Sequence, residues 1–357
     1  MELYKIDAYK ENIEKAANAG IEWDRLSGKK VLVVGATGLI GRYLIDLVMY
    51  KNERDRLGCI LTAISRNKCL ADRIFPKRYF EQDCFRYFQH DVRESFMVDI
   101  DKWDQFDYVI HLASNTHPVA YAQRPIETIT ANVYGTKNLL DLCADLGTAR
   151  FVFPSSVEIY GENRGDTELF TEDYVGYLDS NTLRAGYPES KRVCESLCQA
   201  YRQEKNVDIV IPRLPRVFGP TMGDGDSKAV AQFIKKAAAG EDIILKSAGA
   251  QYYSFLYVAD AVTGLITAML LGKQGEAYNV ADQSCDKTLK EMAELCALAG
   301  RRNVRYEYPD EVEKSGYSTA TKARLDSGKI KMLGWSSAFS IEEGLRQTIR
   351  MLREKTA

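Results

Sequence analysis

The sequence has little of what metal sites, disulfide frameworks and membrane spans require. It contains three His and eight Cys in 357 residues, and no two Cys form a CxxC pair. This composition argues against a zinc site, and scattered thiols are typical of a reducing cytosol. Cys194 and Cys198 share a predicted helix face, and we interpret them as small buried side chains and not as metal ligands.

A surplus of charge is also absent. Lys and Arg number 48 against 50 Asp and Glu, for a net charge of −2, which gives no electrostatic basis for binding nucleic acid or an anionic membrane. The first segment, MELYKIDAYKENIEKAANAG, lacks the apolar core of a signal peptide. The most apolar later segment, AVTGLITAMLLG, is too short to span a bilayer. We therefore expect a soluble, cytoplasmic protein that binds no nucleic acid and no membrane.

What the sequence does contain is an alternation of short apolar runs and amphipathic segments. Short β-branched runs predict buried strands, and apolar residues at helical spacing predict helices between them. Strands are expected at residues 29–35, 59–65, 108–114, 150–156 and 207–214, and helices at 39–50, 132–147 and 187–205. Repeated strand–helix units predict an α/β fold with a parallel sheet covered by helices on both faces.

A glycine pattern stands at the first strand–helix junction. VLVVGATGLIG places Gly35, Gly38 and Gly41 as GxxGxxG. Glycine permits positive φ and close backbone approach to a pyrophosphate, and the helix N-terminus offers free N–H groups to that anion. A tight structural turn is the alternative, but the position predicts a Rossmann-type, doubly wound dinucleotide-binding domain. The expected cofactor contacts of this segment are Gly35, Thr37, Gly38, Leu39, Ile40, Gly41 and Arg42.

The end of the second predicted strand bears on which dinucleotide binds. NAD-selective sites carry an acidic residue there, but AISRN offers Ser65 and Arg66. Arg66, together with Arg42, suits the 2′-phosphate of NADP, while a solvated loop Arg66 is an equally good interpretation. Asp91 in QHDVRE is an expected adenine contact. The predicted cofactor is NAD or NADP, with NADP favoured by Ser65 and Arg66.

The chain divides by pattern into three parts. Residues 1–27 form an extension with a predicted helix, which either caps the sheet edge or supports a dimer. Residues 28–215 form the dinucleotide-binding domain. Beyond residue 216 the alternation loosens, and no Pro- or Ser-rich linker appears. Residues 216–357 are therefore predicted to form mainly a smaller substrate-binding lobe, interwoven with the first domain.

Two tyrosine–lysine pairs occur at helical spacing in one predicted helix. Tyr187 and Lys191 lie in YPESK, and Tyr201 and Lys205 lie in YRQEK. Tyr187 opens the helix just after a loop, whereas Tyr201 lies four turns further along. Ser156 ends a predicted strand, and the carboxyl ends of parallel strands share one edge of the sheet. We therefore predict that Ser156 and Tyr187 converge, and interpret Tyr201 and Lys205 as ordinary helix surface.

The chemistry of proton transfer needs more than a tyrosine. A phenol with a pKa near 10 is a poor base at neutral pH. An ammonium group one turn away, assisted by a positive nicotinamide ring, stabilises the phenolate. Tyr187 then takes a proton from a substrate hydroxyl as hydride leaves its carbon, Ser156 holds that hydroxyl, and Lys191 also grips the nicotinamide ribose.

Several motifs in order give the chain a family resemblance. GATGLIG, HLAS, NVYGT, SSVEIYG, YPESK and RLPRVFGP together resemble an extended short-chain dehydrogenase/reductase of the nucleotide-sugar epimerase/dehydratase family. The resemblance runs from about residue 28 to the end. EDYVGY, KAVAQFI and LGWSSAFSIEEGL are similar to segments of the UDP-glucuronate decarboxylases, also called UDP-xylose synthases.

This resemblance implies a reaction in which a sugar hydroxyl, usually at C4, is oxidised to a ketone by bound cofactor, before epimerisation, loss of water or loss of a carboxylate. It implies a homodimer formed through the helices that contain residues 132–146 and 187–205. The implied catalytic residues are Ser156, Tyr187, Lys191 and Glu158. The other implied cofactor contacts are Asp91, Val92, Leu112, Ala113, Ser114, Asn132, Tyr187, Lys191 and Leu214, and the implied substrate contacts are Thr116, Ser155, Arg216, Lys228 and Tyr253.

Three positions depart from the family pattern. Val157 stands where dehydratases carry an Asp beside the Glu, which argues against the standard dehydratase mechanism. Arg216 replaces the Asn of RxxNxxGP, and Tyr253 replaces the Arg that decarboxylases carry before FxYVxD. We interpret the changes at Arg216 and Tyr253 together: the cation that binds phosphate in the family is absent at position 253 and is supplied from position 216.

Two further hypotheses stay open. One is a net NADP-dependent reductase or dehydrogenase of a nucleotide-activated sugar or polyol. The other is a non-catalytic protein that senses a dinucleotide.

Overall fold

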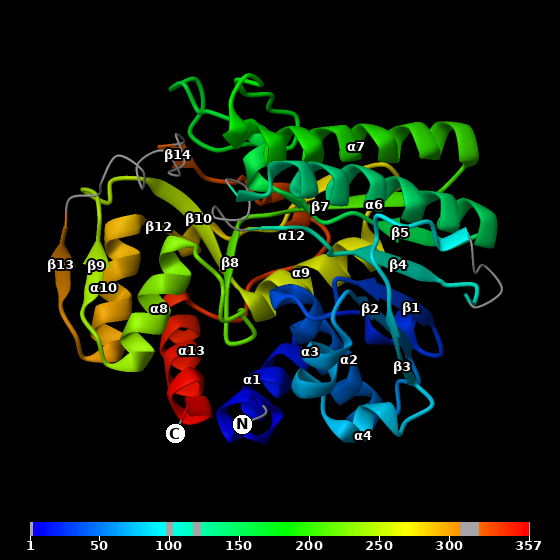
Figure 1. Cartoon of the computed structure of the whole chain (residues 1–357), viewed down its shortest axis with the longest axis horizontal. Helices are drawn as coiled ribbons and strands as arrows, with labels where there is room; N and C mark the ends of the chain where they lie inside the picture. Colours follow the sequence, from blue (N-terminus) through cyan, green and yellow to red (C-terminus); the bar gives the residue numbers. More distant parts are fainter. Residues whose placement is uncertain (1–2, 98–102, 117–122, 308–320, 357) are drawn as a thin grey trace.

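The computed structural model describes residues 3–97, 103–116, 123–307 and 321–356, which form two lobes (Figure 1). The larger lobe is built on an eight-stranded sheet in the order β3-β2-β1-β4-β5-β7-β11, with β6 also paired to β7. Its strands are β1 (Lys30–Val34), β2 (Ile60–Ser65), β3 (Phe85–Gln89), β4 (Tyr108–His111), β5 (Arg150–Val152), β6 (Ser155–Ser156), β7 (Ile209–Leu214) and β11 (Ala277–Asn279). Neighbouring strands of this sheet are parallel, so the predicted doubly wound parallel sheet is confirmed.

The strand order reverses at β1. Val31 is paired with Leu61 of β2 on one side and with Tyr108 of β4 on the other. The chain therefore leaves the ends of β1 and β4 in opposite directions, and a crevice opens at the carboxyl edge between them. The glycine turn begins directly after β1, at this edge.

Both faces of the sheet are covered by helices. Val31 and Val33 of β1 belong to one hydrophobic cluster, and Leu32 and Val34 belong to another. Because alternate side chains of a strand point to opposite faces, a strand buried on both faces is apolar throughout. The covering helices are α2 (Leu39–Asp55) and α9 (Val258–Leu271) on one face, and α6 (Pro125–Leu146) and α7 (Gly186–Lys205) on the other.

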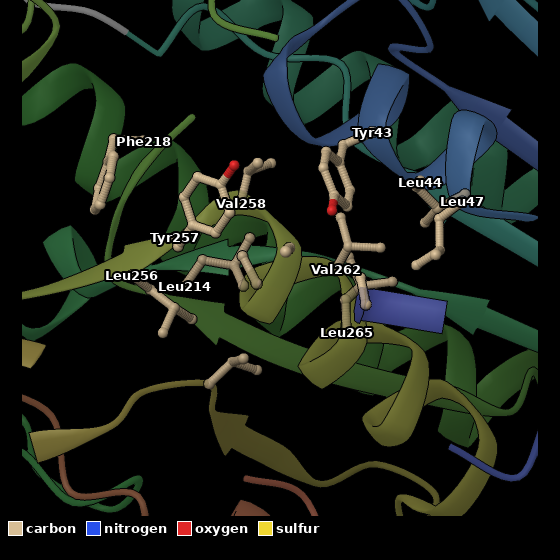
Figure 2. Packing of buried hydrophobic residues seen from close by; sticks show 14 of the residues in the cluster. Tyr43, Leu44, Leu47, Leu214, Phe218, Leu256, Tyr257, Val258, Val262 and Leu265 are labelled. Atoms are coloured by element: carbon tan, nitrogen blue, oxygen red, sulfur yellow. The ribbon is translucent and has the colours of Figure 1, made fainter. Parts of the chain in front are cut away.

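The face beneath α2 and α9 holds the larger cluster. Figure 2 shows Tyr43 and Leu47 of α2 opposite Val262 and Leu265 of α9, all four buried. On the other face, α6 and α7 lie side by side (Figure 1). Cys194 and Cys198 of α7 are free thiols buried there, as predicted.

The smaller lobe pairs short strands with three packed helices. The strands are β8 (Arg216–Phe218), β10 (Tyr252–Tyr257), β12 (Asp286–Thr288) and β14 (Lys322–Ala323) in one sheet, and β9 (Ile243–Leu245) with β13 (Val304–Tyr306) in another. The helices are α8 (Ala229–Ala239), α10 (Leu289–Gly300) and α13 (Ile341–Thr356). After β10 the chain returns to the larger lobe, where α9 packs on α2 and β11 extends the main sheet beside β7.

The N-terminal extension ties the two lobes together. Helix α1 (Asp7–Ala17) packs on α2, α9 and α13. The Tyr9 hydroxyl donates to Asp46 Oδ2 of α2 at 2.7 Å, and Lys15 Nζ pairs with Glu343 Oε1 of α13 at 2.7 Å. Helix α1 therefore lies over the helix layer, and not along an edge strand as one of the two expectations had it.

The remaining elements are short. They are η1 (Leu3–Lys5), η2 (Trp23–Leu26), α3 (Lys68–Ile74), α4 (Lys77–Phe80), η4 (Val157–Tyr160), η5 (Leu183–Ala185), η6 (Gln283–Cys285) and α12 (Gly328–Lys331). None of the described helices combines the length and apolar composition that crossing a bilayer requires.

Candidate active site

The glycine turn is held closed by contacts that only glycine allows. Gly35 has φ +89°, and a Cβ there would lie 2.6 Å from the Ala113 nitrogen and from the Leu112 carbonyl carbon. A Cβ at Gly41 would lie 2.5 Å from the Gly35 oxygen. These distances are shorter than real Cβ contacts, so the turn, the end of β4 and the start of α2 approach each other as backbone.

The residues present fit the phosphates of a dinucleotide. Gly38 is the exposed N-cap of α2, and no side chain caps it. The first N–H groups of an α-helix lack intrahelical partners, and the helix dipole favours an anion at this end. Thr37, Leu39 and Ile40 are half-buried around the same turn. The turn therefore offers backbone donors without a competing side chain.

A basic pocket lies next to the end of β2. Its volume is about 510 Å³. It is lined by Arg66, Asn67, Lys68, Cys69, Gln89, Asp91, Arg93 and Arg124. Four of these residues are cations and one is an acid, so the pocket suits an anionic group. Ser65 sits beside it, 8% exposed, with its hydroxyl 2.9 Å from the Tyr87 hydroxyl.

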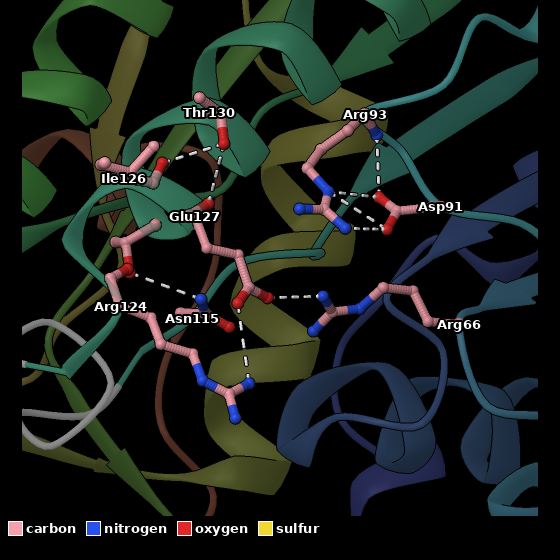
Figure 3. A network of polar contacts seen from close by, with 9 residues as sticks. Arg66, Asp91, Arg93, Asn115, Arg124, Ile126, Glu127 and Thr130 are labelled. Atoms are coloured by element: carbon pink, nitrogen blue, oxygen red, sulfur yellow. Dashed lines mark hydrogen bonds and ion pairs between the residues drawn. The ribbon is translucent and has the colours of Figure 1, made fainter.

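Carboxylates hold the cations of this pocket in place (Figure 3). Arg66 Nη1 donates to Glu127 Oε1 at 2.7 Å, and Arg124 Nη1 lies 3.6 Å from Glu127 Oε2. Arg93 donates from Nη2 to Asp91 at 2.6 Å, and this bond lowers the pKa of Asp91. Asp91, the predicted adenine contact, thus lines the pocket, but its carboxylate already accepts hydrogen bonds from Arg93.

The structure does not bring Arg42 to Arg66. The Arg42 side chain is 8% exposed, its Nη2 donates to the Ile74 carbonyl at 3.3 Å, and its Nε lies 3.9 Å from Asp46 Oδ2. Arg42 is the fourth residue of α2 and turns into the layer beneath α3, so it does not line the basic pocket.

The predicted convergence of Ser156 and Tyr187 is present. Ser156 ends β6 and caps η4, where its Oγ accepts from Glu158 N at 3.2 Å. Tyr187 lies in the first turn of α7 and is 6% exposed. Burial raises the pKa of the Tyr187 phenol to about 12, and a side-chain hydrogen bond with Ser156 opposes that rise. The phenol is therefore protonated at neutral pH in the protein alone.

Lys191 lies one helical turn beyond Tyr187 and is buried. Its Nζ donates to the Pro154 carbonyl at 3.0 Å and lies 4.6 Å from the centre of the Phe153 ring. Burial lowers the pKa of Lys191. The ammonium is thus held against the end of β5, on the side where the crevice opens.

A hydrogen-bond chain links three of the sequence motifs. Ser114 Oγ donates to Asn132 Oδ1 at 2.7 Å, Asn132 Nδ2 donates to Ser190 Oγ at 2.8 Å, and Ser190 Oγ donates to the Tyr187 carbonyl at 2.7 Å. The chain joins the end of β4 to α6 and to the first turn of α7. It fixes the helix that carries Tyr187 relative to the crevice.

The second tyrosine–lysine pair lies away from this cluster. Lys205 is exposed, but Tyr201 is half-buried and its hydroxyl donates to Asp141 Oδ1 of α6 at 2.5 Å. The interpretation of Tyr201 as plain surface was therefore incomplete, because it links α7 to α6.

Glu158 has two arginine partners. Arg184 Nη2 donates to its Oε2 at 3.1 Å, and Arg216 Nη2 lies 3.5 Å from its Oε1. Arg216 also stacks on Tyr253, with its guanidinium carbon 3.5 Å from the ring centre. Sequence reasoning missed Arg184, although its place three residues before Tyr187 was the available signal.

The other predicted residues lie at the edges of this region. Lys228 Nζ is 3.3 Å from Asp226 Oδ2 in the loop before α8. Thr116 is exposed at the end of a described stretch. Buried or half-buried at strand ends or in loops are Val92, Leu112, Ala113, Ser155 and Leu214.

The fold, its switch point and the glycine turn define a dinucleotide-binding α/β protein, and comparison with known proteins agrees. The model of the NAD dependent epimerase/dehydratase family matches residues 31–281. UDP-glucuronic acid decarboxylase 6 of Arabidopsis thaliana is 30% identical over 89% of this chain and 87% of the relative. UDP-glucuronic acid decarboxylase 1 of Xenopus tropicalis is 29% identical over 92% of this chain and 73% of the relative.

A solved dTDP-glucose 4,6-dehydratase from Streptomyces venezuelae, with NAD bound, has the same fold at a TM-score of 0.76. It is 22% identical, and the match covers 91% of this chain and 97% of that one. The chain belongs to the NAD-dependent epimerase/dehydratase family. The predictions of an enzyme of the extended short-chain dehydrogenase/reductase type and of an NAD-type cofactor are thereby confirmed.

Proposed function

We propose that this enzyme acts on a nucleotide sugar through a 4-keto intermediate. The observation that carries the proposal is the meeting of Ser156 with the buried phenol of Tyr187, at the sheet edge where the glycine turn stands. The relatives named as UDP-glucuronic acid decarboxylases support a sugar nucleotide as substrate.

The proposed mechanism assigns one task to each side chain. A dinucleotide held at the glycine turn of Gly35, Gly38 and Gly41 would supply hydride transfer to and from the sugar carbon. Ser156 holds the sugar hydroxyl, and Tyr187 removes its proton. The raised pKa of Tyr187 means that ionisation needs nearby positive charge, and Arg184 already lowers that pKa. We propose that Lys191, one turn further along α7, adds to this charge when the cofactor is bound. Glu158 lies two residues after Ser156, and its backbone N–H donates to the Ser156 hydroxyl, so we place it beside the sugar.

We place decarboxylation or dehydration ahead of epimerisation. Glu158 supports this order, since plain 4-epimerases often carry Thr at that position, and the curated relatives named above are decarboxylases. Val157 beside it speaks against the standard dehydratase mechanism. We propose Thr116, Ser155, Arg216, Lys228 and Tyr253 as the substrate contacts.

NADP is the proposed form of the cofactor. The pocket at Arg66 holds four cations next to the strand end where a ribose 2′-phosphate would be bound. Each is paired with a carboxylate, so a phosphate would share these cations with Glu127, Asp91 and Asp72. The same observation favours a second candidate function, net reduction of a nucleotide-activated sugar or polyol, because that reaction consumes NADPH.

We also propose a cytoplasmic homodimer formed through α6 and α7. Apolar side chains are exposed on both helices, with Ile126 at 77%, Tyr134 at 54% and Val193 at 46%. An apolar surface of this kind on two adjacent helices suits a four-helix interface.

The test is to incubate the protein with UDP-, dTDP-, GDP- and CDP-sugars and to measure product masses. A product isomeric with the substrate, or lighter by water or carbon dioxide, supports the 4-keto reaction, while stoichiometric NADPH consumption supports the reductase. Tyr187→Phe is expected to retain dinucleotide binding and to lose turnover by about three orders of magnitude. Tyr201→Phe is the matched control, and near-normal turnover in Tyr187→Phe would remove the central assignment.

A further inference from the structure

The guanidinium of Arg216 lies over an aromatic ring beside the candidate active site. Arg216 begins β8, which runs parallel to β10 and pairs Arg216 with Phe255. Tyr253 lies on β10 two residues before Phe255. The guanidinium carbon is 3.5 Å from the centre of the Tyr253 ring, and Tyr253 is 5% exposed. A cation–π contact of this kind restrains the guanidinium and leaves its N–H groups for hydrogen bonds.

The donors of Arg216 are not saturated by the protein. Its Nη2 lies 3.5 Å from Glu158, which is long for a charged hydrogen bond. Its Nη1 is buried, and no residue in the described ranges accepts a hydrogen bond from it. The large majority of buried side-chain polar atoms in proteins have a hydrogen-bond partner, so an unpaired Nη1 points to an acceptor that a ligand supplies.

The local charge favours an anion. Arg184 and Arg216 flank the single carboxylate of Glu158, which leaves one positive charge in excess. Glu158 N in turn donates to Ser156, which meets Tyr187. The excess charge therefore adjoins the residues proposed to carry the chemistry.

We propose that Arg216, supported by Tyr253 and flanked by Glu158, binds one anionic oxygen group of the substrate. The group is a carboxylate on the sugar or the diphosphate of the nucleotide, since a planar guanidinium pairs with either. This inference rests on the proposed function, because it takes the substrate to be a nucleotide sugar.

The experiment measures binding by calorimetry, without turnover, for UDP, UDP-glucose and UDP-glucuronate. Arg216→Gln is expected to weaken binding about tenfold or more. An equal loss for all three ligands assigns Arg216 to the diphosphate, and a loss confined to UDP-glucuronate assigns it to the carboxylate. Arg350→Gln, an exposed arginine paired with Glu354, is the matched control and is expected to bind as the unaltered protein does.

Two variants of the ring test its part in the site. Tyr253→Phe keeps the stacking surface and is expected to bind within about twofold of the unaltered protein, while Tyr253→Leu loses the surface and is expected to weaken binding about threefold or more. Should Arg216→Gln fail to fold, Arg216→Lys keeps the charge without the planar fork, and a reduced affinity is again expected.

Unchanged affinity of every folded Arg216 variant for all three ligands overturns the inference, as does failure of the unaltered protein to bind any of them. Turnover of a sugar nucleotide by the unaltered protein is measured separately. Turnover together with unchanged Arg216 binding would leave the proposed function standing and remove only the anion site.

Discussion

Replacing Gly35 with Ala tests the dinucleotide cradle directly. An alanine at φ +89° costs about 1–2 kcal/mol of backbone strain. Its Cβ would lie 2.6 Å from the backbone of Leu112 and Ala113, and overpacking of this kind costs about 1–3 kcal/mol more. We therefore expect a loss of about 2–5 kcal/mol in the free energy of unfolding, which for a chain of 357 residues is a fall in Tm of roughly 3–7 °C.

The same change is expected to weaken dinucleotide binding. The contact is with backbone, so the turn must move away from β4 and carries the N-terminus of α2 with it. A displacement near 1 Å at such a site costs about a hundredfold in function, and we expect at least about tenfold weaker NADH binding. Thermal melts with and without NADH, and a fluorescence titration, measure both effects.

Gly20→Ala is the matched control for this experiment. Nothing lies within 4 Å of a Cβ built at Gly20, and its φ is not in the left-handed region, so we expect an unchanged Tm and unchanged binding. If Gly35→Ala melted at the same temperature as the control and bound NADH as tightly, the close approach of turn and strand would be the wrong explanation for the glycine.

Three further predictions concern the cofactor, the helix pair and pH. Arg66→Ala is expected to weaken NADPH binding about tenfold more than NADH binding, because only NADPH carries a 2′-phosphate; equal losses in a titration would contradict the choice of NADP. Tyr201→Phe removes the bond to Asp141 and is expected to lower the free energy of unfolding by about 1–2 kcal/mol in denaturant melts without changing turnover; a stability equal to that of the unaltered protein would show that the bond contributes nothing. Burial raises the pKa of Asp46 from 3.8 to about 6, so the folded state keeps a proton that the unfolded state releases, and this group lowers stability by roughly 3 kcal/mol as pH rises from about 4 to 6. Asp46→Asn is expected to flatten that part of the dependence of Tm on pH, and an unchanged slope would count against a buried, titrating Asp46.

The sequence predicted the strands that are buried on both faces of the sheet, because such strands are apolar along most of their length. Strands β1 and β7 read as apolar runs because helices cover both sides of the sheet, and the glycine spacing marked the turn between β1 and α2. Strand β3, FRYFQ, was harder to recognise because it lies at the sheet edge, where only Phe85 is fully buried and the other four residues are half-buried or exposed. Helix α6 starts at Pro125, seven residues before the expected start, since Pro at the first helical position marks a beginning that apolar spacing alone does not show.

The partners of the site residues were the part that sequence could not supply. Glu127 pairs with Arg66 across 61 positions of the chain, and Arg216 meets Tyr253 only because β8 and β10 are neighbours. Helical and strand periodicity describes contacts within an element, whereas these pairs depend on how distant elements are placed. The residue types at Arg216 and Tyr253 were visible in the sequence, but their stacking was not.

The chain passes from the larger lobe to the smaller one and back, so the larger lobe is not encoded by one continuous segment. A fragment ending at residue 215 would lack α9, whose apolar side chains cover α2, and β11, which pairs with the edge of β7. It would also lose the bond from the Thr221 hydroxyl to the Leu39 carbonyl at the start of α2. Exposed strand edges and uncovered apolar helices lead to self-association. An engineer who wants new specificity on this scaffold must therefore exchange loops within the intact chain, because the nucleotide-binding half is not a module that can be excised.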